Sequence, residues 1–584
     1  MRSLENIVNP NEIRDFSTEE LHLLCGDLRT FLIDSISKTG GHFAANLGVI
    51  ELTVSLLHVF DFEQDKIVWD VGHQAYPYKV LTQRKEFFST LRKKDGISGF
   101  PKRSESPYDH FGTGHSSTSI SAVLGMLCSD FLQKNNLDKN YIAIIGDGAL
   151  SAGQAFEALN NAGYLKLPLL VILNDNHMGI DPVAGALNEY LANLKTHEPN
   201  LFTRLGMDYV GPIDGHNVEE LCKVLEACKE SNRPTFLHIK TTKGKGFLPA
   251  EEEQTKWHAT SGFDKIYPNA QNTASKGIKW QDVMGLKLAE MAAKEENLVA
   301  ITPAMVSGSS LHFMQEKFPQ RVFDVGIAEQ HAVTFAAGMA LQGSKVFCFI
   351  YSTFLQRALD QVIHDVCLQN IPVVFCIDRA GLVGEDGPTH HGAFDIPLLR
   401  AIPNMVLMAP ASQEDAQAMM DFALANPSKS PISIRYPRGI AYSNSLFAKP
   451  VELGKAIEVQ KGSKVALLVF GDLLPIALQT ADLLQQKGIR PSIVNMRFVK
   501  PLDEDLLKEY CTEHTLLCTF ENGSKLGGAG TAVAEWLMDN SPETKLLRLG
   551  LPDSFIEHGS VAEQMHTVGL YAENVVEQIW ERGS

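Results

Sequence analysis

The most constraining feature of this sequence is a recurring unit made of a short apolar run, a Gly-rich or polar turn, and a longer helical stretch. The apolar runs are Ile67–Trp69, Tyr141–Ile145, Leu169–Leu173, Phe236–Ile239, Val346–Ile350, Val373–Ile377, Val465–Phe470 and Leu516–Phe520. Most of them do not alternate with polar residues, which is typical of strands buried on both faces. Strands that alternate with helices form parallel sheets covered by helices. The sequence therefore predicts an α/β protein with three blocks of mainly parallel sheet.

Two irregular stretches divide the chain into three predicted domains. The polar, turn-rich stretch Tyr267–Lys279 is typical of a linker, and no clear periodicity is present at Arg438–Leu453. We therefore expect a first domain at residues 1–268, a linker at 269–279, a second domain at 280–445 and a third domain at 454–584.

Composition and charge exclude several classes of function. The 584 residues include 52 basic and 69 acidic side chains, a formal net charge of −17, which disfavours binding to nucleic acid or anionic membranes. No apolar run approaches the roughly 18 residues of a membrane span, and the first ten residues lack a secretory signal pattern. The nine cysteines form no Cys-x-x-Cys pair, which predicts reduced thiols and a cytoplasmic location.

One segment carries the pattern of a metal and diphosphate site. The run Tyr141–Ile145 leads into a Gly-Asp-Gly turn at Asp147, and the next run leads into Asn176, 29 positions further on. Ligands of parallel sheets bind at the carboxyl ends of the strands. Mg²⁺ prefers oxygen ligands, which Asp147, Asn176 and the backbone carbonyl of Met178 would supply. Gly-Asp-Gly alone is also a common strand-to-helix turn, but the second turn at this spacing favours the metal and diphosphate interpretation.

This pair of turns resembles the signature of thiamine diphosphate enzymes, and further motifs narrow the resemblance. They are GGHFAANLGVIELT (Gly40–Thr53), WDVGHQAYPYK (Trp69–Lys79), GISGFPKRSES (Gly96–Ser106), HFGTGHSSTSIS (His110–Ser121), DVGIAEQHAV (Asp324–Val333), YSTFLQRALDQVIHDV (Tyr351–Val366), IDRAGLVGEDGPTHHGAFD (Ile377–Asp395) and RYPRG (Arg435–Gly439). Together these stretches resemble the 1-deoxy-D-xylulose-5-phosphate synthase family.

The resemblance implies a transketolase-like fold, thiamine diphosphate and Mg²⁺ as cofactors, and a homodimer. It also implies a reaction in which pyruvate loses CO₂ and its remaining two carbons join D-glyceraldehyde 3-phosphate, giving 1-deoxy-D-xylulose 5-phosphate. The product would enter isoprenoid, thiamine and pyridoxal synthesis. No nucleic acid or membrane partner is expected.

The resemblance also assigns cofactor and catalytic residues. Glu329 would lie beside the aminopyrimidine ring and exchange a proton with it, although a helix N-terminus also favours an acid on its own. The implied catalytic residues are Glu329, His42, His73 and His390. The implied cofactor-binding residues are His73, Gly114, His115, Ser116, Gly148, Ala149, Asn176, Phe247, Glu329 and Phe354. Phe247 stands where the family is expected to have a tyrosine.

A phosphorylated substrate requires guanidinium groups, because arginine binds phosphate through a planar fork. By resemblance, Arg379, Arg438 and Tyr351 would hold the phosphate of the aldehyde. Arg357 and Asp386 would lie near the polar groups of this acceptor, and His390 would serve proton transfers and substrate hydroxyls. A surface ion pair is the commoner role of an arginine, but Arg379 directly follows a predicted buried strand.

Three alternatives remain at this stage. A transketolase shares the metal turn, the glutamate and the histidines, although Ile377–Gly392 and Trp69–Lys79 match the synthase family closely. A 2-oxo acid dehydrogenase component would require a lipoyl-domain partner. A scaffold that has lost its activity is disfavoured by the presence of Asp147, Asn176 and Glu329.

Overall fold

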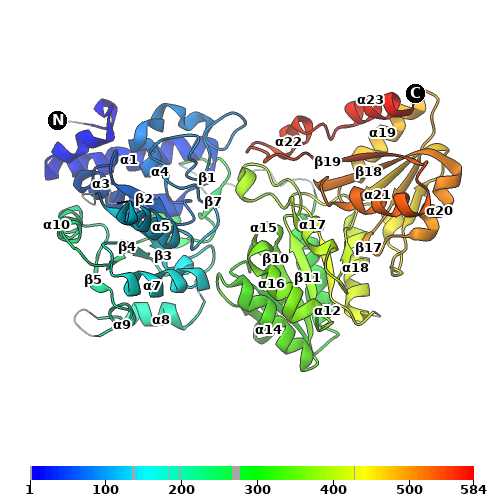
Figure 1. Ribbon diagram of the computed structural model, residues 1–584. Coiled ribbons are helices and arrows are strands. Elements are labelled where there is room, and N and C mark those ends of the chain that lie inside the picture. The colour runs from blue at the N-terminus through cyan, green and yellow to red at the C-terminus, as the bar shows by residue number, and fades with distance from the viewer. Residues whose placement is uncertain are drawn as a thin grey trace. The chain divides into compact units, whose positions relative to one another are not determined.

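The computed structural model describes residues 3–133, 139–182, 184–195, 199–265, 277–426 and 428–583 (Figure 1). It divides into two compact units. Unit 1 comprises Met1–Ala274 and Gly326–Ala328, and unit 2 comprises Ser275–Val325 and Glu329–Ser584. The linker predicted at 269–279 lies mostly outside the described residues. No helix in the described part of the chain is both long enough and apolar enough to cross a membrane.

Unit 1 is built on a five-stranded sheet in which every pair of neighbouring strands is parallel. Its strands, in spatial order, are β2 (Lys66–Trp69), β3 (Tyr141–Gly146), β4 (Leu170–Asp175), β6 (Thr235–Lys240) and β5 (Asp208–Asp214). Its longer helices are α1 (Thr18–Thr39), α3 (Ile50–Val59), α5 (Ser119–Leu132), α7 (Gly153–Leu165), α8 (Ala186–Asn193) and α10 (Val218–Lys229). A two-residue antiparallel pair joins β1 (Gly41–His42) to β7 (Ala259–Thr260).

Both faces of this sheet are covered. Along β3, Ile142 and Ile144 pack into one hydrophobic cluster, while Ala143 and Ile145 pack into another. This arrangement explains why the strand is apolar at every position. An alternating strand would place polar side chains in one of the two cores.

Unit 2 contains a seven-stranded sheet and a five-stranded sheet. The strands of the first, in spatial order, are β17 (Phe498–Lys500), β12 (Val406–Met408), β13 (Ile432–Arg435), β11 (Val374–Asp378), β10 (Lys345–Tyr351), β8 (Leu298–Thr302) and β9 (Val322–Asp324). Those of the second are β14 (Ile457–Gln460), β16 (Ser492–Asn495), β15 (Lys464–Phe470), β18 (His514–Ser524) and β19 (Lys545–Leu551). The larger helices are α12 (Trp280–Ala292), α14 (Glu329–Leu341), α18 (Gln413–Ala425), α19 (Leu474–Gln486), α20 (Glu504–Glu513), α21 (Ala529–Asn540) and α23 (Ala572–Gly583).

The two sheets of unit 2 are mainly parallel, with one antiparallel edge strand each. The edge strand β17 comes from the C-terminal part of the chain but pairs with β12, with Met408 opposite Phe498. The C-terminal part therefore completes the first sheet as well as forming the second. The predicted α/β class is confirmed, and each of the eight apolar runs contains or overlaps a strand.

Candidate active site

The predicted site residues fall in both units. In unit 1, strands β3 and β4 are neighbours, and acidic side chains follow or end both of them. Asp147 begins α6 (Asp147–Leu150), and Asp175 ends β4. Ligand atoms of Asp147, Asp175 and His177 all lie within 4.8 Å of one another. This cluster contains the predicted ligand Asp147 and adds two residues that the sequence interpretation left out.

The carboxylate of Asp147 has features that suit a cation ligand. It is buried, Oδ1 accepts a hydrogen bond of 2.8 Å from the backbone N–H of Gly148, and Oδ2 has no hydrogen-bond partner among the described residues. Burial, followed by the charge of Asp175, raises the pKa of Asp147 to about 7. A buried carboxylate with an unused oxygen is a group that a divalent cation would stabilise.

The other two predicted ligands lie on the turn after β4. Asn176 Oδ1 accepts a hydrogen bond of 3.1 Å from the N–H of Met178, whose backbone pairs with Pro182. This contact closes the turn that carries both residues. The roles of Asn176 and Met178 as metal ligands remain predictions.

A buried chain of polar groups supports Asp175 from behind. Nε2 of His238 lies 2.9 Å from Oδ2 of Asp175, and Nδ1 of His238 lies 2.9 Å from the hydroxyl of Tyr209. His238 and Asp175 are fully buried, and the hydrogen bond from His238 lowers the pKa of Asp175 against the opposing effect of burial. Asp175 therefore remains an anion next to Asp147.

Lys243 adds a buried positive charge to the same region. Only 1% of this residue is exposed, and Nζ donates a hydrogen bond of 2.6 Å to the carbonyl of Gly179. Burial lowers the pKa of Lys243 to about 8, while the charges of Asp147 and Asp181 oppose this decrease. A buried ammonium group near the acidic turn suits a site for a diphosphate.

Three histidines of unit 1 form an aromatic cluster. The ring centroids of His42 and His73 are 5.7 Å apart, and His258 lies 5.8 Å from His42 and 5.2 Å from His73. The hydroxyl of Tyr76 lies 3.3 Å from Nδ1 of His42. Burial, with a smaller effect from Lys243, lowers the pKa of His73 to about 3, so this imidazole is neutral near pH 7.

The turn at Gly114–Ser116 is anchored through the residues that follow it. Asp70, directly after β2, accepts hydrogen bonds from the N–H groups of Ser117 at 2.6 Å and Ser119 at 3.0 Å. Ser117 Oγ donates to the carbonyl of Ala149 at 2.7 Å. The predicted cofactor residues His115 and Ser116 are therefore connected, through Ser117, to the turn that carries Gly148 and Ala149.

Phe247 lies in an aromatic cluster at the start of α11 (Leu248–Glu252). Its ring centroid is 5.3 Å from Phe43, 5.4 Å from Trp257 and 5.9 Å from Phe263. This packing gives Phe247 a structural role, and its predicted contact with the cofactor remains a prediction.

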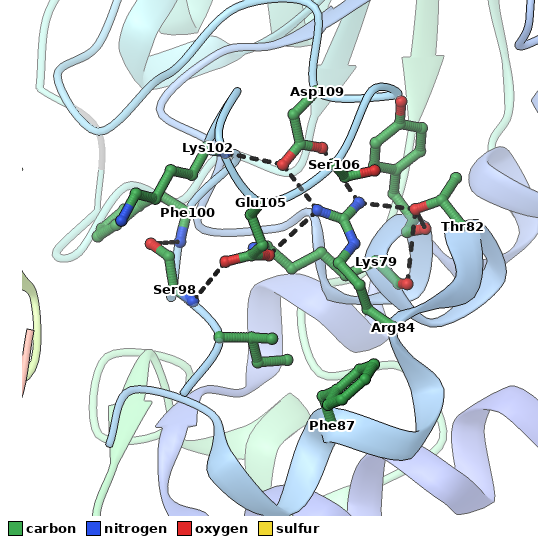
Figure 2. Close-up of polar contacts among 12 residues, drawn as sticks. Lys79, Thr82, Arg84, Phe87, Ser98, Phe100, Lys102, Glu105, Ser106 and Asp109 are labelled. Carbon is green, nitrogen blue, oxygen red and sulfur yellow. Dashed lines mark hydrogen bonds and ion pairs between the residues drawn. The ribbon is translucent and has the colours of Figure 1, made fainter. Parts of the chain in front are cut away.

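Figure 2 shows a buried ion network that holds the loop containing Phe100 and Lys102. Arg84 lies between Asp109, at 2.7 Å and 3.1 Å, and Glu105, at 3.2 Å, and Lys79 also pairs with Glu105. The same carboxylates accept from the backbone N–H groups of Lys102 and Ser98. The Phe100 ring lies 5.2 Å from His42, so the network positions a wall of the histidine cluster.

In unit 2, Glu329 is the first residue of α14 and is 3% exposed. Its Oε2 atom has no hydrogen-bond partner among the described residues and lies 3.6 Å from Nη1 of Arg357. Burial raises the pKa of Glu329, and the charge of Arg357 opposes this effect. A buried carboxyl group with a raised pKa holds its proton more readily than an exposed glutamate and suits proton transfer.

Three predicted residues form an aromatic stack near the ends of β10 and the following helix. Phe354 stacks on Tyr351 with ring centroids 5.5 Å apart and an interplanar angle of 7°. The ring of His390 meets Phe354 at 5.7 Å and an angle of 78°. The structure thus brings His390 into contact with an aromatic pair, Tyr351 and Phe354, that lies 39 and 36 positions earlier in the sequence.

Arg379 directly follows β11 and is largely buried, as expected. It pairs with Asp378, donates to the carbonyl of Gly308 at 2.9 Å and lies 4.3 Å above the ring of Tyr351. The guanidinium is therefore fixed beside one of its predicted partners. Burial raises the pKa of Asp378 to about 6, while the charge of Arg379 opposes the increase.

Arg438 is more exposed, follows β13 and contacts the loop that contains Asp386. Nη1 donates to the carbonyl of Val383 at 2.7 Å and to Glu385 at 3.1 Å, and it lies 3.9 Å from Asp386. The structure thus groups Arg438 with Asp386, and it places Arg357 beside Glu329 rather than in this group.

Models of known protein families match most of the chain. The model of the family "1-deoxy-D-xylulose-5-phosphate synthase" matches residues 4–200 and 194–241. The pyrimidine-binding domain of transketolase matches 276–442, and the C-terminal domain of transketolase matches 454–575. The overlap of the two first matches at 194–200 indicates that the match is interrupted inside unit 1.

Curated relatives match the whole chain. A 1-deoxy-D-xylulose-5-phosphate synthase of Cytophaga hutchinsonii is 45% identical, over 99% of this chain and 98% of the relative. Those of Methylobacillus flagellatus and Natranaerobius thermophilus are 47% and 45% identical, over 99% and 100% of this chain and 98% and 99% of the relatives.

The three helix-covered sheets, the acidic turn after β3 and the buried glutamate at the start of α14 define an enzyme of the transketolase type, a class that uses thiamine diphosphate. Within this class, the chain belongs to the 1-deoxy-D-xylulose-5-phosphate synthase family.

Proposed function

We propose that this enzyme condenses pyruvate with D-glyceraldehyde 3-phosphate to give 1-deoxy-D-xylulose 5-phosphate and CO₂. Family membership over the full chain supports the reaction. The observation that carries the proposal is the presence of two prepared acidic groups: Asp147 in unit 1 and Glu329 in unit 2, each with a buried carboxylate oxygen that lacks a hydrogen-bond partner in the described structure.

The residues of unit 1 fit a diphosphate bound through Mg²⁺. Asp147 offers an unused oxygen, Asn176 and Met178 lie on the neighbouring turn, and Lys243 supplies a buried positive charge. A Cβ atom added at Gly146 would meet no atom within 4 Å, so there is free space beside Asp147. We infer that Asp147, Asn176 and the Met178 carbonyl hold Mg²⁺, with His115, Ser116, Gly148 and Ala149 at the diphosphate.

The residues of unit 2 fit the aminopyrimidine ring. Glu329 would hold or release a proton at Oε2, and the face of Phe354 would pack on the ring. When bound, thiamine diphosphate supplies a carbon that adds to the keto group of pyruvate and an electron sink for the loss of CO₂. The part of the protein is to orient the reactants, exclude water and move protons.

The histidines would carry the remaining proton transfers. His73 is neutral and lies in ring contact with His42 within unit 1. His390 lies on the loop after β11 in unit 2, with its ring against Phe354. In this proposal His42, His73 and His390 are catalytic residues because each would contact a substrate oxygen that gains or loses a proton.

The aldehyde phosphate would bind to unit 2. Arg379, Arg438 and Tyr351 would contact the phosphate, because Arg379 is fixed against the Tyr351 ring and Arg438 is fixed by the Val383 carbonyl. Asp386 lies 3.9 Å from Arg438 and would accept a hydrogen bond from a substrate hydroxyl. Arg357, beside Glu329, would contact the other polar groups of the substrates.

The proposal also covers organisation and location. The domains would be a diphosphate-binding domain at 1–268, a pyrimidine-binding domain at 280–445 and a C-terminal domain at 454–584, assembled as a homodimer in the cytoplasm. The nine cysteines, all of which are free thiols, suit a reducing compartment. The product would serve isoprenoid, thiamine and pyridoxal synthesis.

Product analysis tests the proposed function. The purified protein is incubated with Mg²⁺, thiamine diphosphate, pyruvate and D-glyceraldehyde 3-phosphate, and the sugar phosphate is identified by mass. We expect a five-carbon deoxy-ketose phosphate. Turnover of xylulose 5-phosphate with ribose 5-phosphate, with no use of pyruvate, would instead assign the protein to transketolase activity.

A further inference from the structure

The acceptor loop, residues 379–392, carries Arg379, Asp386 and His390. Its backbone is held by side chains and carbonyl groups of the C-terminal part of the chain. The sequence predicts no role at the site for that part. All of these contacts between the acceptor loop and the C-terminal part lie within unit 2.

Gln564 makes the most specific of these contacts. It lies on α22 (Val561–Thr567) and is 3% exposed. Its Oε1 atom accepts from the N–H of Gly384 at 3.1 Å, and its Nε2 atom donates to the carbonyl of Gly384 at 2.8 Å. The carboxamide thus binds both polar groups of one residue, which neither a carboxylate nor an apolar side chain can reproduce.

Asn522, at the C-terminal end of β18, holds the residue two positions earlier in the loop. Its Oδ1 atom accepts from the N–H of Leu382 at 3.0 Å, and its Nδ2 atom donates to Asp472 at 2.9 Å. A Cβ atom at Gly381 would lie 2.2 Å from the Asn522 side chain. The loop therefore approaches the C-terminal part so closely that only glycine fits at position 381.

His391 connects the amide of Val383, between Leu382 and Gly384, to the C-terminal part. Its Nδ1 atom accepts from the N–H of Val383 at 3.1 Å, so the ring proton is on Nε2, which lies 3.0 Å from the carbonyl oxygen of Ile556. Burial, its largest cause, lowers the pKa of His391 to about 4, and the ring is neutral near pH 7. Three successive amides, at Leu382, Val383 and Gly384, are thus fixed.

The fixed segment contacts Arg438, which is predicted to bind the substrate phosphate. The carbonyl of Val383, between the two residues held by Asn522 and Gln564, accepts the hydrogen bond of 2.7 Å from Arg438. Any shift of this segment would therefore move the acceptor of the Arg438 guanidinium. Misplacement of a positioning group by a small distance is costly when binding depends on its geometry.

We propose that the C-terminal part of the chain positions the acceptor loop for the aldehyde phosphate, with Gln564 as the principal positioning residue. The proposal rests on the proposed function for the identity of the substrate. Gln564 acts through the backbone of Gly384 and, one residue away, through the Val383 carbonyl on Arg438. Pyruvate carries no phosphate, so its binding should depend little on these contacts between the acceptor loop and the C-terminal part.

The experiment compares Gln564→Leu with the wild-type protein and with Gln485→Leu, an exposed glutamine of the same part of unit 2. His391→Asn is a second variant, because asparagine can still accept from Val383 but is too short to reach Ile556. Hydrogen–deuterium exchange of peptides that cover 379–392 is measured without substrates. KM and kcat are then measured separately for pyruvate and for D-glyceraldehyde 3-phosphate.

We expect Gln564→Leu to accelerate exchange in the loop about tenfold and to raise the KM for the aldehyde phosphate about tenfold, with the KM for pyruvate changed less than about twofold. His391→Asn should likewise raise the KM for the aldehyde phosphate much more than the KM for pyruvate. Gln485→Leu should match the wild type. Unchanged exchange in Gln564→Leu, or equal increases in both KM values, would overturn the proposal. Absence of product from the wild-type protein would instead refute the proposed function. The exchange result would still test whether Gln564 holds the acceptor loop.

Discussion

The Nη1 atom of Arg357 lies 3.6 Å from the Oε2 atom of Glu329, the first residue of α14. Burial favours the protonated form of this carboxyl group, and the guanidinium favours the ionised form. The two effects oppose each other, and they hold Glu329 in a state from which a proton can be gained or lost. This balance is what a proton-transfer residue requires.

Replacing Glu329 by Gln should lower the rate of product formation by about 10²-fold to 10⁴-fold, the range expected for loss of a general acid or base. Binding of Mg²⁺ and the diphosphate should change little, because those ligands belong to unit 1. The measurement is hydrogen–deuterium exchange at C2 of bound thiamine diphosphate. Exchange at the wild-type rate in Glu329→Gln would show that this residue is not the proton-transfer group.

Removing Arg357 should raise the pKa of Glu329, because burial then acts without opposition. The infrared band of the protonated carboxyl, assigned by its loss in Glu329→Gln, should persist to higher pH in Arg357→Met. Protonation of Glu329 stabilises the fold, since its pKa is above the ordinary value, and this stabilisation is lost as pH rises through the pKa. A band that disappears at lower pH than in the wild type would contradict the assignment.

His238→Gln should weaken the metal site, although His238 itself is not a ligand in the proposal. It fixes Asp175, which lies beside Asp147, and loss of a supporting partner typically costs 10-fold to 100-fold in metal affinity. Calorimetric titration of Mg²⁺ in the presence of thiamine diphosphate measures this effect. His22→Gln, at an exposed histidine of the same unit, is the control. Equal affinities in both variants would exclude a supporting role for His238.

Arg438→Ala should raise the KM for D-glyceraldehyde 3-phosphate by about 10-fold or more and leave the KM for pyruvate nearly unchanged, because a charged hydrogen bond to phosphate contributes about 1.5–3 kcal/mol. Steady-state kinetics with each substrate varied in turn gives both values. Arg490→Ala removes an exposed arginine of the same unit and should have no effect. Equal changes for both substrates would make Arg438 a structural residue.

Arg84→Met should destabilise unit 1 by about 3–5 kcal/mol, because Asp109 and Glu105 would keep buried charges with fewer partners. Denaturant unfolding measures the change. Arg103→Met, at an exposed position directly after Lys102, should change stability by less than about 0.5 kcal/mol. A loss below about 1 kcal/mol in Arg84→Met would show that the network contributes little.

The sequence allowed the strands and the local turns to be predicted, because these depend on neighbouring residues. Asp147 was identified from its turn after a strand, and Glu329 was assigned by the family resemblance. Asp175 and His238 were missed, because their contact depends on β4 lying next to β6 in a fixed register. Within the apolar run of β6, His238 looks like an ordinary core histidine.

Long-range contacts explain the other omissions. Lys243 and His258 lie in segments without strong periodicity, and nothing local indicates that they lie near the acidic turn or the histidine cluster. The role of Gln564 could not be predicted at all, since its partner Gly384 is 180 positions away. The dimer and the ligand set of the metal remain predictions.

The most direct test of the central claim uses pyruvate labelled with ¹³C at carbons 2 and 3, together with D-glyceraldehyde 3-phosphate, Mg²⁺ and thiamine diphosphate. We predict that both labelled carbons appear in a 1-deoxy-pentulose phosphate and that unlabelled CO₂ is released in equal amount. A pentulose phosphate without label, or CO₂ release with no dependence on the aldehyde, would contradict the proposed reaction.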